Sequence, residues 1–194
     1  PLNKLRGSRD NLYIFSNISI NFIPIFLLNR IHAKGGKVIL YFIDSLSNNN
    51  TRVAYWYTKK FHFDIIYTFD PKDALTNGFI FRYTMYSKLL LPSQNIKYDA
   101  VFIGSNKGRI NVVKEILKNC PKTKFYFDIL GVPNQDKKGL LKNSIDLNYV
   151  ECIEKDMQSN CIIDIVTDQN QAGLSLRVFE AVVYNKKLVS NNPS

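Results

Sequence analysis

Short apolar runs rich in β-branched and aromatic residues recur along the chain, and each is bounded by polar residues. Such runs are typical of strands buried in a sheet. The run at residues 37–44 is apolar almost throughout, which is typical of a parallel sheet covered on both faces. The strands predicted in this way cover residues 11–15, 37–44, 63–69, 79–83, 98–104, 123–130, 161–166 and 186–189.

Segments with helix signals lie between the predicted strands. The clearest one begins at Asp70, a good N-cap residue, and continues with Pro71 at the first helical position. A helix is also expected over residues 24–33, with Asn21 or Ser19 as its cap. The remaining helices are predicted at 51–61, at 109–119, at 149–158 and between Gly173 and Tyr184.

Strand and helix therefore alternate in two successive halves, each with four strands. This alternation predicts parallel sheets with right-handed crossovers. Because a polar turn cluster lies at 92–95, we predict a linker at 93–97 between domains at 1–92 and 98–194. The predicted fold class is α/β, with two Rossmann-like parallel-sheet domains facing a cleft. We expect a fragment truncated at both ends, since the sequence starts without Met and stops just after a strand.

The composition narrows the classes of partner. The net charge is +10 with a pI near 9.5, yet the lysines are scattered and form no tight basic cluster, so we expect no nucleic-acid partner. Cys120, Cys152 and Cys161 lack C-x-x-C spacing and are expected to be reduced thiols. His32 and His62 lie far from any cysteine pair, so no metal site is expected.

Residues 170–183 form the most informative stretch, because a glycine loop there follows a predicted strand and opens a helix. A helix N-terminus offers free N–H groups and a positive dipole end, which suit a phosphate. Gly173, Leu174 and Ser175 are candidates to bind it, and Arg177 either reaches the same anion or pairs with a surface acid. The alternative is that these residues form an ordinary strand–helix–strand unit, as in any α/β protein, without a binding role.

The stretch Gly-Leu-Ser-Leu-Arg-x-x-Glu-Ala at 173–181, followed by the Lys-Lys-Leu-Val strand, resembles the donor-binding segment of GT-B glycosyltransferases. It is most similar to bacterial lipopolysaccharide and capsular polysaccharide glycosyltransferase-like proteins. The string Phe-Asp-x-x-Tyr-Thr-Phe-Asp-x-x-Asp-Ala at 63–74, followed by Tyr86, resembles the end of the first domain in the same family. The resemblance implies that the glycine loop faces the donor diphosphate.

The resemblance also implies individual roles. Glu180 matches the glutamate that holds the nucleotide ribose; the alternative is an exposed helix acid. Many retaining members carry a second glutamate where this chain has Ala172, so neither their donor-sugar contact nor their stereochemistry carries over. In the loop after the first strand of the second domain, Lys107 and Arg109 are candidates to neutralise the diphosphate. Arg109 is favoured because its planar fork binds phosphate at two points, and the alternative is a solvated charged turn.

No D-x-D triplet occurs, so we expect transfer without a metal and with the nucleotide-sugar as substrate, not as cofactor. If the reaction inverts the sugar carbon, it needs a general base. Asp44, at the end of a predicted strand, ranks first as a base or acceptor contact. Asp70 is a second candidate, although a helix cap explains it better.

The function predicted from these residues is transfer of a sugar from a nucleotide-activated donor to a lipid-linked glycan or to a lipopolysaccharide or capsule acceptor. Such an enzyme is expected in the cytoplasm, at the inner membrane face, where a basic acceptor domain suits an anionic surface. One alternative is a non-catalytic nucleotide- or sugar-binding protein of the same fold. Another is an NAD-type oxidoreductase, although the sequence lacks G-x-G-x-x-G after an N-terminal strand.

Overall fold

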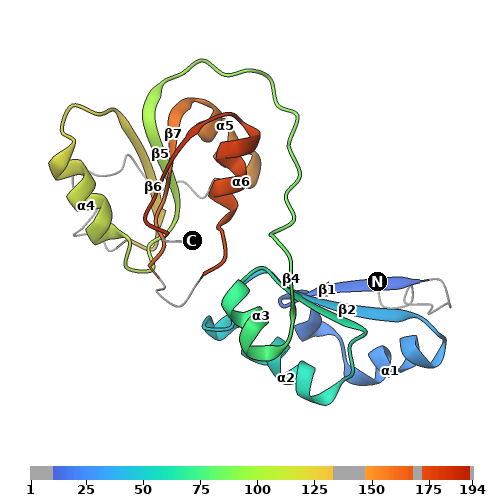
Figure 1. The fold of residues 1–194 in the computed structure, drawn as a ribbon. Coiled ribbons are helices and arrows are strands. Elements are labelled where there is room, and N and C mark those ends of the chain that lie inside the picture. Colours follow the sequence, from blue (N-terminus) through green and yellow to red (C-terminus); the bar gives the residue numbers. More distant parts are fainter. Residues whose placement is uncertain (1–10, 133–146, 168–171, 193–194) are drawn as a thin grey trace. The chain divides into compact units, whose positions relative to one another are not determined.

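The computed structural model describes residues 11–132, 147–167 and 172–192. The elements in chain order are β1 (Leu12–Ser16), η2 (Ser19–Phe22), α1 (Ile25–Ala33), β2 (Lys37–Phe42), η3 (Asn49–Thr51), α2 (Arg52–Lys60), β3 (Ile65–Thr68), α3 (Pro71–Asn77), β4 (Ile80–Phe81), β5 (Tyr98–Ser105), α4 (Ile110–Asn119), β6 (Phe125–Leu130), α5 (Tyr149–Met157), β7 (Ser159–Asp164), α6 (Leu176–Val183) and β8 (Lys187–Ser190). The predicted alternation of strands and helices is confirmed, and the chain is an α/β protein with two four-stranded parallel sheets (Figure 1).

Contacts divide the chain into two compact units, and the main division falls between Thr84 and Met85. The first unit contains β1 to β4, and the second contains β5 to β8. The segment between Met85 and β5 has no regular structure, but it is bonded to Tyr184, the C-cap residue of α6. The Leu89 N–H donates to the Tyr184 hydroxyl at 3.0 Å, and that hydroxyl donates to the Leu89 carbonyl oxygen at 3.2 Å. Residues before the expected linker at 93–97 thus pack with the second unit.

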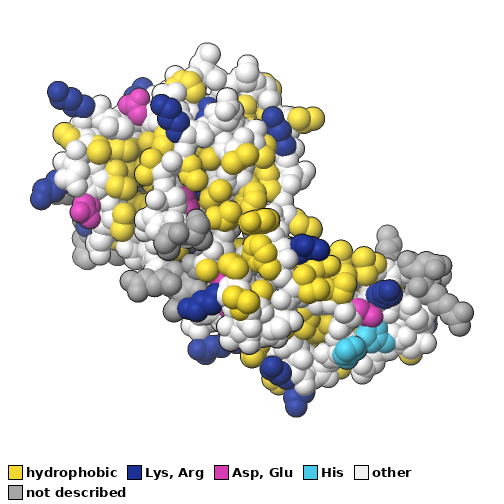
Figure 2. Space-filling view, viewed as in Figure 1, with side chains coloured by type: hydrophobic (Ala, Val, Ile, Leu, Met, Phe, Trp, Pro, Cys, Tyr) yellow, Lys and Arg dark blue, Asp and Glu magenta, His cyan; other side chains and the backbone are white. Residues whose placement is uncertain are grey.

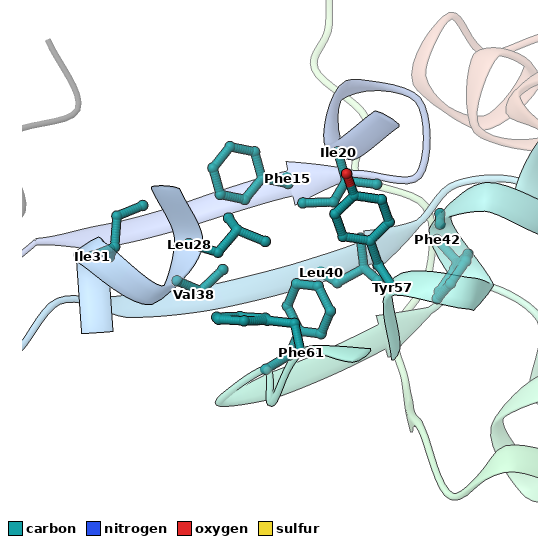
Figure 3. Packing of buried hydrophobic residues seen from close by; sticks show 11 residues of the cluster. Phe15, Ile20, Leu28, Ile31, Val38, Leu40, Phe42, Tyr57 and Phe61 are labelled. Carbon is teal, nitrogen blue, oxygen red and sulfur yellow. The ribbon is translucent and has the colours of Figure 1, made fainter. Parts of the chain in front are cut away.

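The first sheet has the strand order β1-β2-β3-β4, so the chain adds each new strand on the same side of the last one. Right-handed crossovers then put every helix on one face of the sheet. Side chains from α1 and α2 pack there against strand residues of the same face (Figure 3). The core consists of Phe15, Ile20, Leu28, Ile31, Val38, Leu40, Phe42, Ala54, Tyr57, Phe61 and Phe63.

The other face of the first sheet carries apolar side chains that these helices do not cover. Ile14, Ile39 and Ile65 are register partners on that face, and the Ile14 side chain is 55% exposed. Figure 2 shows hydrophobic side chains gathered over this sheet. The central strand β2 is nevertheless buried on both faces, as its apolar run predicted, because Ile39 and Tyr41 on this side are only 5% and 4% exposed. The exposed Ile14 belongs to the edge strand β1.

Two local expectations are corrected. The helix over 24–33 begins at Ile25 with Pro24 as its N-cap, and neither Asn21 nor Ser19 caps it. The Ser19 hydroxyl accepts the Ser16 N–H at 2.8 Å instead, so this serine closes a turn after β1. By contrast, Asp70 caps α3 as predicted: its Oδ1 accepts the N–H of Lys72 at 2.9 Å.

The second sheet has the strand order β6-β5-β7-β8. The chain therefore adds β6 on one side of β5 and then crosses back to add β7 on the other side, which reverses the strand order. One face packs on α4 through Phe102, Val113, Phe127 and their neighbours. The other face packs on α6 through Val101, Ile162 and Ala181. Open parallel sheets bind ligands beside such a reversal, outside the carboxyl ends of the strands. That point lies at the ends of β5 and β7.

Candidate functional site

A pocket of about 260 Å³ lies in the second unit, over the face of the sheet that α5 and α6 cover. Its floor is the carboxyl half of β5, next to the reversal of strand order, and its walls come from the two helices. The polar residues that line it are Ser105, Asp128, Tyr149, Asp156, Arg177 and Glu180. The pocket therefore brings two of the predicted site residues, Arg177 and Glu180, together with four others.

Glu180 is buried on the inner face of α6 and lines this pocket. Its Oε1 accepts the hydroxyl of Tyr149, on α5, at 3.1 Å. Burial raises the pKa of Glu180 and Asp164 raises it further, while Arg177 and the Tyr149 hydrogen bond partly oppose this. Glu180 is only 6% exposed, so the alternative interpretation, that it is an exposed helix acid, is wrong.

A second carboxyl group lines the same pocket from α5. Burial, together with the neighbouring Glu180, raises the pKa of Asp156 to about 8, against the opposing effect of Arg177 and Lys186. Burial also raises the pKa of the Cys152 thiol to about 11, so it is not a reactive thiolate at neutral pH. The interior of the pocket thus contains buried acids, and hydrogen-bond donors of a ligand would offset the free-energy cost of burying them.

Arg177 is the cation of the pocket. Its guanidinium donates to the carbonyl oxygen of Ile103 and lies over the Phe102 ring, with 4.8 Å between Cζ and the ring centroid. Gly104 makes room for it, because a Cβ at that position would lie 2.7 Å from an Arg177 Nη atom. Arg177 therefore lies at the end of β5 and does not pair with a surface acid in the described residues.

The two diphosphate-binding candidates in the basic loop after β5, Lys107 and Arg109, have different surroundings. Lys107 is exposed, in the left-handed backbone region at φ 39°. Arg109 is half-buried: its Nε donates to the carbonyl oxygen of Ile165 at 2.7 Å and its Nη1 to that of Ser105 at 2.9 Å. Burial and the nearby Arg177 lower the pKa of Arg109. Arg109 thus joins the ends of β5 and β7, which differs from the solvated turn considered as its alternative.

The glycine loop is divided between the two units. Gly173 and Leu174 group with the first unit, and Ser175 groups with the second as the N-cap residue of α6. The Ser175 hydroxyl donates to Asp164 Oδ1 at 2.8 Å, and Ser190 donates to the other oxygen at 2.9 Å. The Ser175 hydroxyl predicted to bind phosphate is thus engaged at the end of β7.

Asp44 lies in the first unit, just beyond the carboxyl end of β2, and is half-buried. Its Oδ2 accepts Nδ2 of Asn17 at 3.2 Å, while Asn17 Oδ1 accepts the Ile43 N–H at 2.8 Å. Asn17 therefore fixes the position of Asp44 after the strand. The role of Asp44 as a base stays a prediction.

Sequence reasoning missed Tyr149, Asp156 and Asp128. A signal for the first two was present, because Tyr149, Cys152 and Asp156 stand at helical spacing on one side of α5. An acid on the side of a helix that carries Cys152 and Ile153 is a sign of a buried polar site. The side chain of Asp128 points to the α5 side only because of strand register, which the sequence does not show.

No protein-family model matches the chain, and no curated protein sequence matches it. Within the described residues, no cluster of His, Cys, Asp or Glu side chains is arranged to hold a metal ion. In the same part of the chain, no helix combines the length and the hydropathy of a membrane span.

Proposed function

We propose that the chain is a GT-B type glycosyltransferase whose second unit binds a nucleotide-activated sugar donor. The observation that carries this proposal is the buried Glu180 carboxyl group in a pocket at the carboxyl ends of the strands. A carboxylate accepts two hydrogen bonds from a ribose diol, and burial strengthens each of them. The resemblance of residues 173–181 to donor-binding segments gives the same residue that role.

Electrostatics divide the proposed donor site into two parts. The interior carries Asp128, Asp156 and Glu180, which suit the hydroxyl and N–H donors of a nucleoside. Arg177 lies at the end of β5, where it can stabilise the negative charge of a diphosphate. Transfer breaks the bond between the sugar carbon and the diphosphate oxygen, so charge grows on the leaving group as an acceptor hydroxyl attacks that carbon.

Arg109 has a positioning role in this proposal. Its two bonds to backbone carbonyl oxygens hold the loops after β5 and β7 together beside the pocket. Lys107, which is exposed on the same loop, remains available to the diphosphate. The acceptor proposed is a lipid-linked glycan or a lipopolysaccharide or capsule chain.

Calorimetric titration of the chain with UDP, GDP, CMP and NAD tests the proposal. We expect one nucleoside diphosphate to bind, and Glu180→Gln to weaken it by about tenfold to a hundredfold, the range for a hydrogen bond to a charged group. Arg177→Gln should weaken the diphosphate and leave the free nucleoside unaffected. Glu115→Gln and Lys118→Gln, at exposed positions of α4, are matched controls that should bind normally.

The pH dependence provides a second readout. Because burial raises the pKa of Glu180, affinity for the ribose should increase as the pH rises past that pKa. The Glu180→Gln variant should lose this contribution and keep only the pH dependence that arises from Asp156 in the same pocket. Binding of NAD alone would support the oxidoreductase instead, and nucleotide binding without sugar transfer would support a non-catalytic binding protein. No binding by the folded chain would contradict the site.

A further inference from the structure

Three tyrosine side chains from different segments of the second unit meet beside Glu180. Tyr86 comes from the irregular segment before β5, Tyr149 begins α5, and Tyr184 is the C-cap residue of α6. The Tyr86 ring stacks on the ring of Phe179, with 6.4 Å between the ring centroids and 16° between the planes. This ring contact places Tyr86 against the helix that carries Glu180.

Two of the three hydroxyl groups already give their protons to other acceptors. Tyr149 donates to Glu180 Oε1 at 3.1 Å, and Tyr184 donates to the Leu89 carbonyl oxygen at 3.2 Å. A hydroxyl group has a single proton, so neither of them can donate a second time, but each oxygen can still accept. Toward these two groups the Tyr86 hydroxyl can therefore act only as a donor.

The Tyr86 hydroxyl is buried, and it has no hydrogen-bond partner of ordinary geometry among the described residues. Burial raises the pKa of Tyr86, and the hydroxyls of Tyr149 and Tyr184 raise it further. Tyr149 responds as an acceptor does: burial and Glu180 raise its pKa to about 12, while the Tyr86 hydroxyl opposes this. A buried donor without an acceptor costs free energy, and of the two neighbouring oxygens the one on Tyr149 leads to Glu180.

We propose that Tyr86 is a positioning residue of the donor site, because its hydroxyl holds that of Tyr149 and thereby fixes the Glu180 carboxyl group. The inference rests on the proposed function, in which Glu180 holds the ribose. Tyr86 does not line the pocket, so it acts through Tyr149. With Oε1 of Glu180 engaged by Tyr149, Oε2 is left for the ribose hydroxyls. A carboxyl group fixed in this way should favour a ribonucleotide over its 2′-deoxy form, because a site built around a hydroxyl rejects the analogue that lacks it.

Ring packing is the competing explanation, since Phe179 would stack on any aromatic residue at position 86. Tyr86→Phe separates the two explanations, because it keeps the ring and removes only the hydroxyl. Tyr184→Phe is the matched control. It removes a hydroxyl of the same cluster whose proton goes to Leu89 and not to Glu180.

The first measurement is calorimetric titration with UDP, GDP and their 2′-deoxy forms. We expect the unchanged chain to bind one ribonucleotide about tenfold more tightly than its 2′-deoxy form, as for a hydrogen bond to a charged group. Tyr149→Phe should remove most of this preference, and Tyr86→Phe should reduce it about threefold. Tyr184→Phe should keep the preference. Thermal melting checks that each variant is folded.

The second measurement needs no nucleotide: the Glu180 carboxyl carbon is followed by nuclear magnetic resonance as the pH changes. Burial raises the pKa of Glu180, and the Tyr149 hydrogen bond lowers it. Tyr149→Phe should therefore make Glu180 titrate at higher pH, and Tyr86→Phe should do so to a smaller extent. The charged groups that act on Glu180 are the same in all these variants: Asp156, Asp164 and Arg177.

The two measurements separate this inference from the proposed function. A Tyr86→Phe variant that keeps the full preference for ribose would overturn the inference, and so would an equal loss in Tyr184→Phe. If the unchanged chain bound no nucleotide, the proposed function would fall, and the titration of Glu180 would then decide whether Tyr86 acts on this carboxyl group. An identical titration in the unchanged chain and in Tyr86→Phe would show that it does not.

Discussion

The two units use the same kinds of elements but visit their strands in different orders. In the first unit the order β1-β2-β3-β4 leaves no reversal among the described strands, and α1 and α2 cover one face. In the second unit the order β6-β5-β7-β8 puts helices on both faces. The reversal separates the loops after β5 and β7, and a pocket with buried acids adjoins it. Strand order, more than composition, thus accounts for the position of this pocket in the second unit.

The units also differ in where their charges lie. Among its described residues, the first encloses one acid, Asp70, which caps α3, and carries cations on the outer side of α1 and α2. The second encloses Asp128, Asp156 and Glu180 beside Arg177. Burial of an ionisable group costs folding free energy unless a partner compensates for it. Buried ionisable groups are therefore candidates for a functional role.

The comparison of the two units requires that each has its own hydrophobic core. Truncating a core side chain tests this requirement, and it should change the unfolding free energy more than the other substitutions below. Leu40 and Ile129 are fully buried in the first and second unit. Leu40→Ala and Ile129→Ala should each cost about 2–5 kcal/mol of unfolding free energy. Hydrogen–deuterium exchange should accelerate in β1 to β3 for the first variant and in β5 to β7 for the second. Equal acceleration everywhere would show one cooperative unit and break the comparison.

Asp156 in the second unit should make a large contribution to the pH dependence of stability. An unfolded aspartate ionises near pH 4, whereas Asp156 in the folded chain ionises near 8, so between these values the folded state binds more protons. Stability should therefore decrease as the pH rises through this interval. Asp156→Asn should remove the contribution of this group, which makes the profile less steep, and gain ~2 kcal/mol or more above pH 8. Thermal melting against pH measures this, with Glu115→Gln as control; a profile that keeps the wild-type slope would refute the assignment.

Gly104 should be required for the position of Arg177. Gly104→Ala places a Cβ against the guanidinium, which must move, at a cost of about 1–3 kcal/mol. Nucleotide affinity should fall about tenfold if Arg177 holds the diphosphate. Glu115→Gln, at an exposed position of α4 away from the pocket, should leave both quantities unchanged. Normal affinity in Gly104→Ala would remove Arg177 from the proposed site.

The smallest expected effect concerns the start of α5. Asn148 and Glu151 form a reciprocal capping box, with the Glu151 N–H bonded to Asn148 Oδ1 at 3.1 Å. Asn148→Ala should cost about 1 kcal/mol and loosen the helix that holds Tyr149. Chemical denaturation measures the loss, and Asn119→Ala at the exposed end of α4 is the control. Indistinguishable midpoints would show that the box adds nothing measurable.

Local signals in the sequence predicted the elements well. Asp70 and Pro71 gave the start of α3, and the apolar run at 98–104 gave β5, because caps and buried runs depend on neighbouring residues. The predicted cap of α1 was wrong, because the Ser19 hydroxyl bonds to the Ser16 N–H and not to the end of the helix.

The site depended on contacts between distant residues. The sequence singled out Arg177 and Glu180, but not the burial of Glu180 under Tyr149, because helix packing decides which side of α6 faces the sheet. Arg109 was expected to bind phosphate, and its bonds to Ser105 and Ile165 became visible only when β5 and β7 came together. Strand order also arises from long-range packing, which no local pattern encodes.

The difference between the two units is tested most directly by hydrogen–deuterium exchange of the full chain with and without a saturating nucleoside diphosphate. We predict that protection increases in the peptides that contain the end of β5 and the first turn of α6, next to Gly104 and Arg177, and that β1 to β3 stay unchanged. Protection confined to β1 to β3, or no change at a concentration that saturates binding by calorimetry, would contradict a donor site in the second unit.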